Sequence, residues 1–202
     1  MDYPHVRIEE CADVRPGFSA KGAIVNDLGG TLQVIAAQHV TKGKNYRYRE
    51  EHAVLISPPK FYEKYTVKTG DILFMSRGAN NYAVLIDSVP DPTIAPLTFF
   101  IIKAMNNVLP EYLAWYLNQE MIKAQLNEIR MGVGTPMIPS KEFRELTIPL
   151  PPLTTQKKIA ELSRLQMRET ELLQDLMEET ERLQQAIGRS LFIGLKTLPD
   201  YD

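Results

Sequence analysis

Residues 154–192, TTQKKIAELSRLQMRETELLQDLMEETERLQQAIGRSLF, determine the architecture that this sequence predicts. Good helix formers dominate the stretch and no proline interrupts it, so it predicts one helix of roughly 55–60 Å. Apolar residues recur with the 3.5-residue period of a coiled coil, with Gln166, Glu169 and Thr180 at polar positions of the same seam. We predict that the apolar seam residues Ile159, Leu162, Leu173, Leu176, Leu183 and Ile187 form a helix–helix interface.

The length of this seam implies a partner outside the chain. A small domain cannot bury so long an apolar stripe against itself, so the stripe must meet another long helix. The sequence predicts only one such helix. The alternative is a helix that folds back on its own domain, and the polar seam positions leave the number of helices in the interface open.

Composition limits the classes of protein that the chain can belong to. Its 202 residues allow one ordinary domain plus an appendage, and an apolar fraction of 44% is typical of a globular protein. The net charge is −2, and the part before residue 154 is neutral. A nucleic-acid-binding surface must therefore be a local patch.

Other signals indicate a soluble, cytoplasmic protein. Cys11 is the single cysteine and cannot form an internal disulfide, and no Cys/His spacing suggests a zinc site. No apolar run approaches the ~20 residues of a membrane span, and the N-terminal MDYPHVRIEE does not resemble a signal peptide.

The part before the long helix predicts an α+β domain that is rich in β-strands. We expect short strands and turns over 6–41, a hairpin of strands 72–76 and 82–87, and a strand over 97–104. A single helix is expected over 109–129, with an inward stripe of Leu113, Tyr116, Leu117, Met121 and Leu126.

Prolines mark the end of this domain. The string RELTIPLPPL, residues 144–153, predicts a strand that stops at a hinge of Pro149, Pro151 and Pro152 before the helix begins. We therefore predict a domain over 1–153, the long helix over 154–192 and a C-terminal tail over 193–202.

A basic loop is the first candidate for binding nucleic acid. Residues 42–51, KGKNYRYREE, place four positive charges beside two tyrosines, a composition typical of loops that contact phosphates and bases. The alternative is a solvated hairpin whose charges pair with Glu50 and Glu51. Under the first interpretation, the contacting residues are Lys42, Lys44, Asn45, Arg47 and Arg49.

Two further loops are candidates. The tip of the predicted hairpin, SRGANN, carries Arg77, Asn80 and Asn81, and arginine and asparagine suit guanine and adenine edges respectively. Ordinary turn chemistry explains the Gly and Asn residues equally well, but not the arginine. The Gly/Pro-rich loop RMGVGTPMIPSKEF, residues 130–143, adds Arg130, Thr135 and Lys141.

Motifs for catalysis are not found in the sequence. It has no glycine-rich phosphate loop that ends in lysine, and Cys11 lacks the signature of a nucleophile. His5, His39 and His52 are scattered without metal-ligand spacing, and we interpret them as ordinary surface or loop histidines. We therefore predict that the chain is not an enzyme and holds no metal or cofactor.

The order of these segments resembles a known family. VRIEECADVRPGFSAKG (6–22), TGDILFMSRG (69–78) and GVGTPMIPSKEFRELTIPLPPLTTQKKIAE (132–161), followed by a long helix, are similar to the specificity (S) subunit of Type I restriction–modification systems. The C-terminal string is specific and the central one is weak. Members of this family usually carry two target recognition domains and two long helices, whereas this chain resembles a half-length subunit with one of each.

The resemblance implies a function and its partners. It implies a homodimer with antiparallel helices that reads a bipartite palindrome in double-stranded DNA. It also implies methyltransferase (M) subunits that carry S-adenosylmethionine and restriction/translocase (R) subunits that use ATP and Mg²⁺. In this scheme residues 42–49 contact phosphates and groove edges, the hairpin tip contacts base edges, and the 130–143 loop provides a third contact.

Other classes of function fit the sequence as well. A coiled-coil scaffold with a protein-binding globular domain would share the helix and the composition. A fragment of a longer specificity subunit is another possibility, against which the N-terminal start and the tail GLKTLPDYD argue mildly.

Overall fold

The structure, a computed structural model, describes residues 3–132 and 134–196. It divides into two compact units, Met1–Glu161, which we call the head, and Leu162–Asp202, the C-terminal unit. Each unit is described by itself. The tail predicted over 193–202 is helical through Lys196, and residues 197–202 lie outside the described residues.

A five-stranded sheet forms the centre of the head. Its strands are β2 (Ala12–Pro16), β9 (Phe99–Ala104), β6 (Ile72–Met75), β7 (Ala83–Ser88) and β4 (Tyr46–Arg47), in that order. Neighbouring strands are antiparallel except for the parallel pair β7 and β4. The hairpin that the sequence predicts is the pair β6 and β7, and the α+β fold class is confirmed.

Apolar side chains cover both faces of this sheet, which explains the continuous apolar runs in its strands. Successive residues of a strand point to opposite faces, so Ile72 and Phe74 join one core while Leu73 and Met75 join the other. Phe74 packs against Phe143 with ring centroids 4.6 Å apart. The first core is completed by α1 (Pro110–Tyr116), α2 (Glu120–Ile129) and α3 (Ser140–Glu145).

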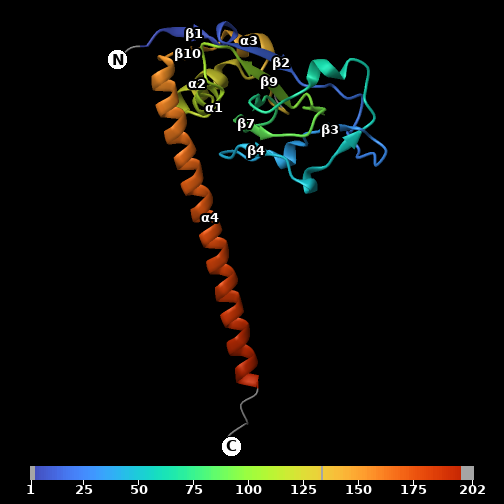
Figure 1. The fold of residues 1–202 in the computed structure, drawn as a ribbon, viewed down its shortest axis with the longest axis vertical. Helices are drawn as coiled ribbons and strands as arrows, with labels where there is room; N and C mark the ends of the chain where they lie inside the picture. Colours follow the sequence, from blue (N-terminus) through green and yellow to red (C-terminus); the bar gives the residue numbers. More distant parts are fainter. Residues whose placement is uncertain (1–2, 133, 197–202) are drawn as a thin grey trace, which may run out of the picture. The chain divides into compact units, whose positions relative to one another are not determined.

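Two small sheets complete the head. In one, β3 (Leu32–Val34) lies between antiparallel β5 (Leu55–Ile56) and parallel β8 (Thr93–Ile94). In the other, β1 (His5–Arg7) pairs with β10 (Thr147–Pro149), so that the first described strand lies beside the last (Figure 1).

The single helix predicted over 109–129 is wrong, because the chain breaks between α1 and α2. At the break Asn118 pairs with the backbone of Ala83 at the start of β7, accepting from its N–H at 3.0 Å and donating to its C=O at 2.9 Å. The break changes the phase of the second helix. Met121, predicted in the inward stripe, is therefore 68% exposed, whereas the other four stripe residues are buried.

The predicted long helix is α4 (Leu153–Lys196), 44 residues in one continuous element (Figure 1). Its first turns belong to the head. Gln156 is fully buried there, accepts from the Leu109 N–H at 2.8 Å and donates to the carbonyls of Asn107 and Pro151. Ile159, predicted in the seam, lies half-buried against the core of the head.

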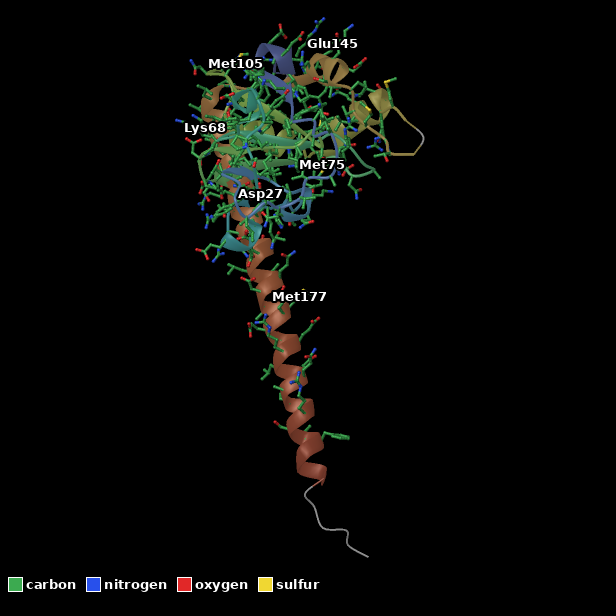
Figure 2. All side chains as sticks on the ribbon, turned by 90° about the vertical axis from the view of Figure 1, so that its right-hand side faces the viewer. Asp27, Lys68, Met75, Met105, Glu145 and Met177 are labelled. Carbon is green, nitrogen blue, oxygen red and sulfur yellow. The ribbon has the colours of Figure 1, made fainter. Side chains whose placement is uncertain are left out.

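In the C-terminal unit the apolar face of α4 is open to solvent. Met177, labelled on this unit in Figure 2, is 65% exposed. Leu165 and Leu172 widen the face beyond the predicted seam, and both are exposed. The predicted seam residues in this unit are all more than half exposed, and they are Leu162, Leu173, Leu176, Leu183 and Ile187.

Candidate nucleic-acid interface

A polar pocket of about 230 Å³ brings three of the predicted loops together in the head. One side is the loop before β4, the second is the β6–β7 loop, and the third is α2 with the residue that follows it. Segments far apart in the sequence thus form one surface. Its polar lining consists of Lys42, Asn80, Asn81, Lys123, Asn127 and Arg130.

Helix α2 supplies one wall of the pocket. Lys123, Asn127 and Arg130 are spaced by four and three residues, which places them on one side of a helix. Leu126 on the same side is buried and anchors α2 to the core. Lys123 and Asn127 are not among the contact residues predicted from the sequence, although their spacing relative to Arg130 was a usable signal.

Arg130 links this wall to the hairpin loop. Its guanidinium donates to Asn81 Oδ1 at 2.7 Å, and Asn81 Nδ2 donates in turn to the Met75 carbonyl at 2.8 Å. The Nε of Arg130 is buried and has no hydrogen-bond partner among the described residues. Asn81, predicted to contact a base, therefore uses its amide to hold Arg130 in place.

The pocket carries an excess of positive charge. Lys42, Lys123 and Arg130 contribute three cations, and Glu120 forms an ion pair with Lys123 at the edge. The hydrogen bond from Lys123, with the attraction of Lys123 and Lys42, lowers the pKa of Glu120, which stays ionised. One carboxylate against three cations leaves a positive site, although the residues before 154 are neutral overall.

Arg77 lies in the same hairpin loop as Asn80 and Asn81. The backbone of the loop is held by a bridge between Arg77 and Met137 and by the Gly78 N–H, which donates to the Pro136 carbonyl at 2.8 Å. Gly78 has φ +95°, a conformation that favours glycine. The side chain of Arg77 is exposed, so the loop is fixed while its guanidinium is accessible.

The remaining predicted contact residues do not line the pocket. Asn45 donates to Asp87 at 3.0 Å and Arg47 pairs with the same carboxylate at 3.6 Å, while Arg49 pairs with Glu51 at 3.4 Å. The Arg49–Glu51 pair agrees with the alternative in which the loop charges pair with the neighbouring glutamates, whereas Asn45 and Arg47 bond to Asp87 on β7 instead. Lys44, Thr135 and Lys141 also lie outside the pocket, with exposed or half-exposed side chains.

The tyrosine that precedes Arg47 is a core residue rather than a base-stacking platform. Tyr46 is 3% exposed and packs in the second core, because alternate residues of β4 point to opposite faces. Burial, with a smaller effect of neighbouring Tyr48, raises the pKa of the Tyr46 hydroxyl to about 12. Tyr46 is therefore part of the core and does not share the exposed surface of Arg47.

Two of the histidines that look scattered in the sequence meet in the structure. The rings of His39 and His52 stack with centroids 4.6 Å apart, between η2 (Ala37–His39) and η3 (Glu50–His52). Burial first, and His39 second, lower the pKa of His52. Within the described residues, groups of three or more His, Cys, Asp or Glu that could hold a metal ion are not found.

In the part of the chain that the structure describes, none of the helices has the length and apolarity needed to cross a membrane.

Comparison with known proteins identifies a family. The family model for the Type I restriction modification DNA specificity domain matches residues 2–182 of this chain. No curated protein matches it. The match covers both the head and most of α4, and it confirms the resemblance seen in the sequence.

Solved structures share the fold. The chain is similar to the HsdS subunit from Thermoanaerobacter tengcongensis, with a TM-score of 0.60, 18% identity, and coverage of 83% of this chain and 38% of that one. It is also similar to the S subunit from M. genitalium, with a TM-score of 0.62, 14% identity, and coverage of 95% of this chain and 46% of that one. A third similar structure is described as the structural basis of complex assembly and conformational transition of the type I R-M system. It has a TM-score of 0.66 and 20% identity, and the match covers 92% of this chain and 44% of that one. This chain thus spans less than half the length of each of them.

Proposed function

Because the chain belongs to the family of Type I restriction modification DNA specificity domains, we propose that it is the sequence-reading subunit of a Type I restriction–modification complex and has no catalytic activity of its own. The observation that carries the proposal is the convergence of the basic loop, the hairpin loop and α2 on one positive pocket. DNA is the polymer whose repeated phosphates such a surface fits.

The accessible side chains beside the pocket suit sequence readout. Arg77 extends from a loop whose backbone is tied to Met137 and Pro136, and its guanidinium can donate two parallel hydrogen bonds to a guanine edge. Asn80 is exposed in the same loop and suits adenine. Phosphate contacts would come from the basic residues around them, which gives the positioning and reading functions separate residues.

We also propose that two copies of the chain act together. The exposed seam of α4 needs a second long helix, and the related structures are more than twice as long as this chain. A pair of copies with antiparallel helices supplies two heads and two helices. Two-fold symmetry of the pair would make the DNA target a bipartite palindrome.

The partners proposed for this dimer are those of the family. The dimer would position M subunits carrying S-adenosylmethionine, and R subunits using ATP and Mg²⁺, on the DNA in the cytoplasm. The structural relative whose description mentions complex assembly of a type I R-M system supports this scheme. The chain's own contribution is to place that chemistry at one sequence.

The proposal is tested by mass and by sequence selection. Light scattering should give about twice the 23.0 kDa mass of the chain, and a strict monomer at micromolar concentration would contradict the dimer. The chain with its methyltransferase subunits should enrich one two-part palindrome from a random duplex library. Enrichment of no sequence would favour a coiled-coil scaffold whose head binds protein.

A further inference from the structure

We propose that the pocket between Lys42, Lys123 and Arg130 holds one backbone phosphate of the bound DNA. The phosphate would set the position of the loop between β6 and β7, residues 76–82, which we call the reading loop. This inference rests on the proposed function and deepens it, because it assigns α2 a direct contact with DNA. It adds Lys123 and Asn127 to the interface and gives Lys42 and Arg130 one shared ligand.

The hydrogen-bonding groups of the pocket favour a phosphate over a base. Ammonium and guanidinium groups are donors only, and a phosphodiester accepts hydrogen bonds through its free oxygens. Asn81 has its amide oxygen occupied by Arg130 and its amide nitrogen by the Met75 carbonyl. A base edge presents donors as well as acceptors, and the three cations cannot satisfy those donors, so among the other lining side chains only Asn80 and Asn127 could accept from a base.

Free donor capacity remains in the pocket for such a ligand. Within the described residues, no ion pair shorter than 4.0 Å involves Lys42, and the hydrogen bond from Arg130 to Asn81 uses Nη2 of the guanidinium and leaves Nη1 without a partner. Lys123 pairs with Glu120, an exposed carboxylate that can be displaced toward solvent. The volume of about 230 Å³ holds a phosphate group together with several waters, each of which takes ~30 Å³.

Binding at this point would fix the register of the hairpin on the DNA. Asn80 and Asn81 line the pocket, and Arg77 precedes them in the same loop. A phosphate held against this loop places Arg77 at a fixed distance from the neighbouring base edges, because the loop backbone is tied to Met137 and Pro136. The pocket would then position the chain while Arg77 reads.

The experiment compares salt dependence of binding to a duplex of mixed sequence, using the full chain with its methyltransferase subunits. Lys42→Gln, Lys123→Gln and the double variant remove charge without removing Asn81 or Arg130, which support the fold. The proposed dimer carries two such pockets, so the double variant should lower the magnitude of the slope of log Kobs against log salt by about 1.8, one phosphate per head, and weaken binding roughly 60-fold near ~0.1 M salt. Each single variant should fall between wild type and the double variant.

A matched control is Lys60→Gln, which neutralises an exposed lysine outside the pocket and should leave slope and affinity unchanged. A slope change of about 3.6 in the double variant would mean two separate phosphate contacts in each head and would overturn the shared pocket. Unchanged slope and affinity would overturn it too. Stabilisation of the wild type by inorganic phosphate that the double variant loses, without any change in duplex binding, would assign the pocket to a free anion instead.

These results are separable from the proposed function. If the wild-type complex enriches one sequence from a random library while the double variant keeps its salt slope, sequence reading stands and the phosphate pocket is wrong. If the double variant enriches a different sequence, the pocket reads bases, which also overturns the inference. If the wild-type complex enriches nothing, the proposed function itself fails.

Discussion

Arg130 donates a 2.7 Å hydrogen bond to Asn81, 49 residues away in the sequence. The bond connects the end of α2 to the loop between β6 and β7. Asn81 in turn donates a hydrogen bond to the carbonyl of Met75, which is the last residue of β6. The geometry of the reading loop is therefore set within the head before any DNA is bound.

Asn81→Ala should lower the free energy of unfolding by about 1–3 kcal/mol. The substitution removes both hydrogen bonds and leaves a partly buried guanidinium and a carbonyl without their partner. Its neighbour Asn80 is exposed, so Asn80→Ala should change stability by less than ~0.5 kcal/mol. Urea denaturation of both variants provides the comparison, and equal losses would show that the Asn81 bonds do not stabilise the loop.

Arg77→Ala should weaken binding to the recognised sequence by ~1–3 kcal/mol and hardly affect binding to unrelated DNA. The reason is that its accessible guanidinium is placed to read a base edge. Anisotropy titrations with cognate and unrelated duplexes measure both affinities. A similar loss on both DNAs would reassign Arg77 to a phosphate contact.

Replacing both Leu173 and Leu176 with Asp should dissociate the proposed dimer, at a cost of several kcal/mol, because charges would enter the apolar seam. Gln174→Asp, between them but outside the seam, adds a charge to the same helix and should leave the dimer intact. Sedimentation velocity distinguishes the two states. A double-aspartate variant that still sediments as a dimer would place the interface elsewhere.

Gln156→Ala should destabilise the head by about 2–4 kcal/mol. The buried amide is hydrogen-bonded to the Leu109 N–H and to two carbonyls, and its removal leaves them unsatisfied in the core. Gln185→Ala, on the exposed part of the same helix, is the matched control. If the two variants unfold at the same denaturant concentration, the start of α4 does not depend on Gln156.

The stability of the head should fall as the pH drops below about 6.5 because of His52. Its pKa is lowered in the folded state, so the unfolded chain binds the proton first, and this contribution to stability is present above 6.5 and lost on acidification. His52→Gln should flatten the dependence of melting temperature on pH between about pH 7 and pH 5. His5→Gln, an exposed histidine outside the stack, controls for the loss of a histidine. An unaltered pH profile in His52→Gln would show that the stacked pair does not couple to folding.

Periodicity in the sequence was enough to predict α4 and the β6–β7 hairpin, because both follow from local patterns. The break between α1 and α2 could not be predicted in this way. It depends on the pairing of Asn118 with Ala83, 35 residues away, and the wrong prediction for Met121 followed from missing it. Likewise, Ile159 fits the seam pattern, but its side chain packs against the core of the head.

The candidate site was predicted in pieces. Lys42, Asn80, Asn81 and Arg130 came from three separate loops, and the structure places them around one pocket. The pairing of Arg47 with Asp87 was not visible in the sequence, because it requires β4 to lie parallel to β7. Composition finds basic loops, but only the fold decides which of their charges face an acidic neighbour and which face the pocket.

The pairing of β1 with β10 closes the head on itself, since residues 5–7 run antiparallel to residues 147–149. Polypeptide therefore enters and leaves this unit at neighbouring points. A module with such an entrance and exit can be inserted into another chain, joined in tandem or circularly permuted without rearranging its interior.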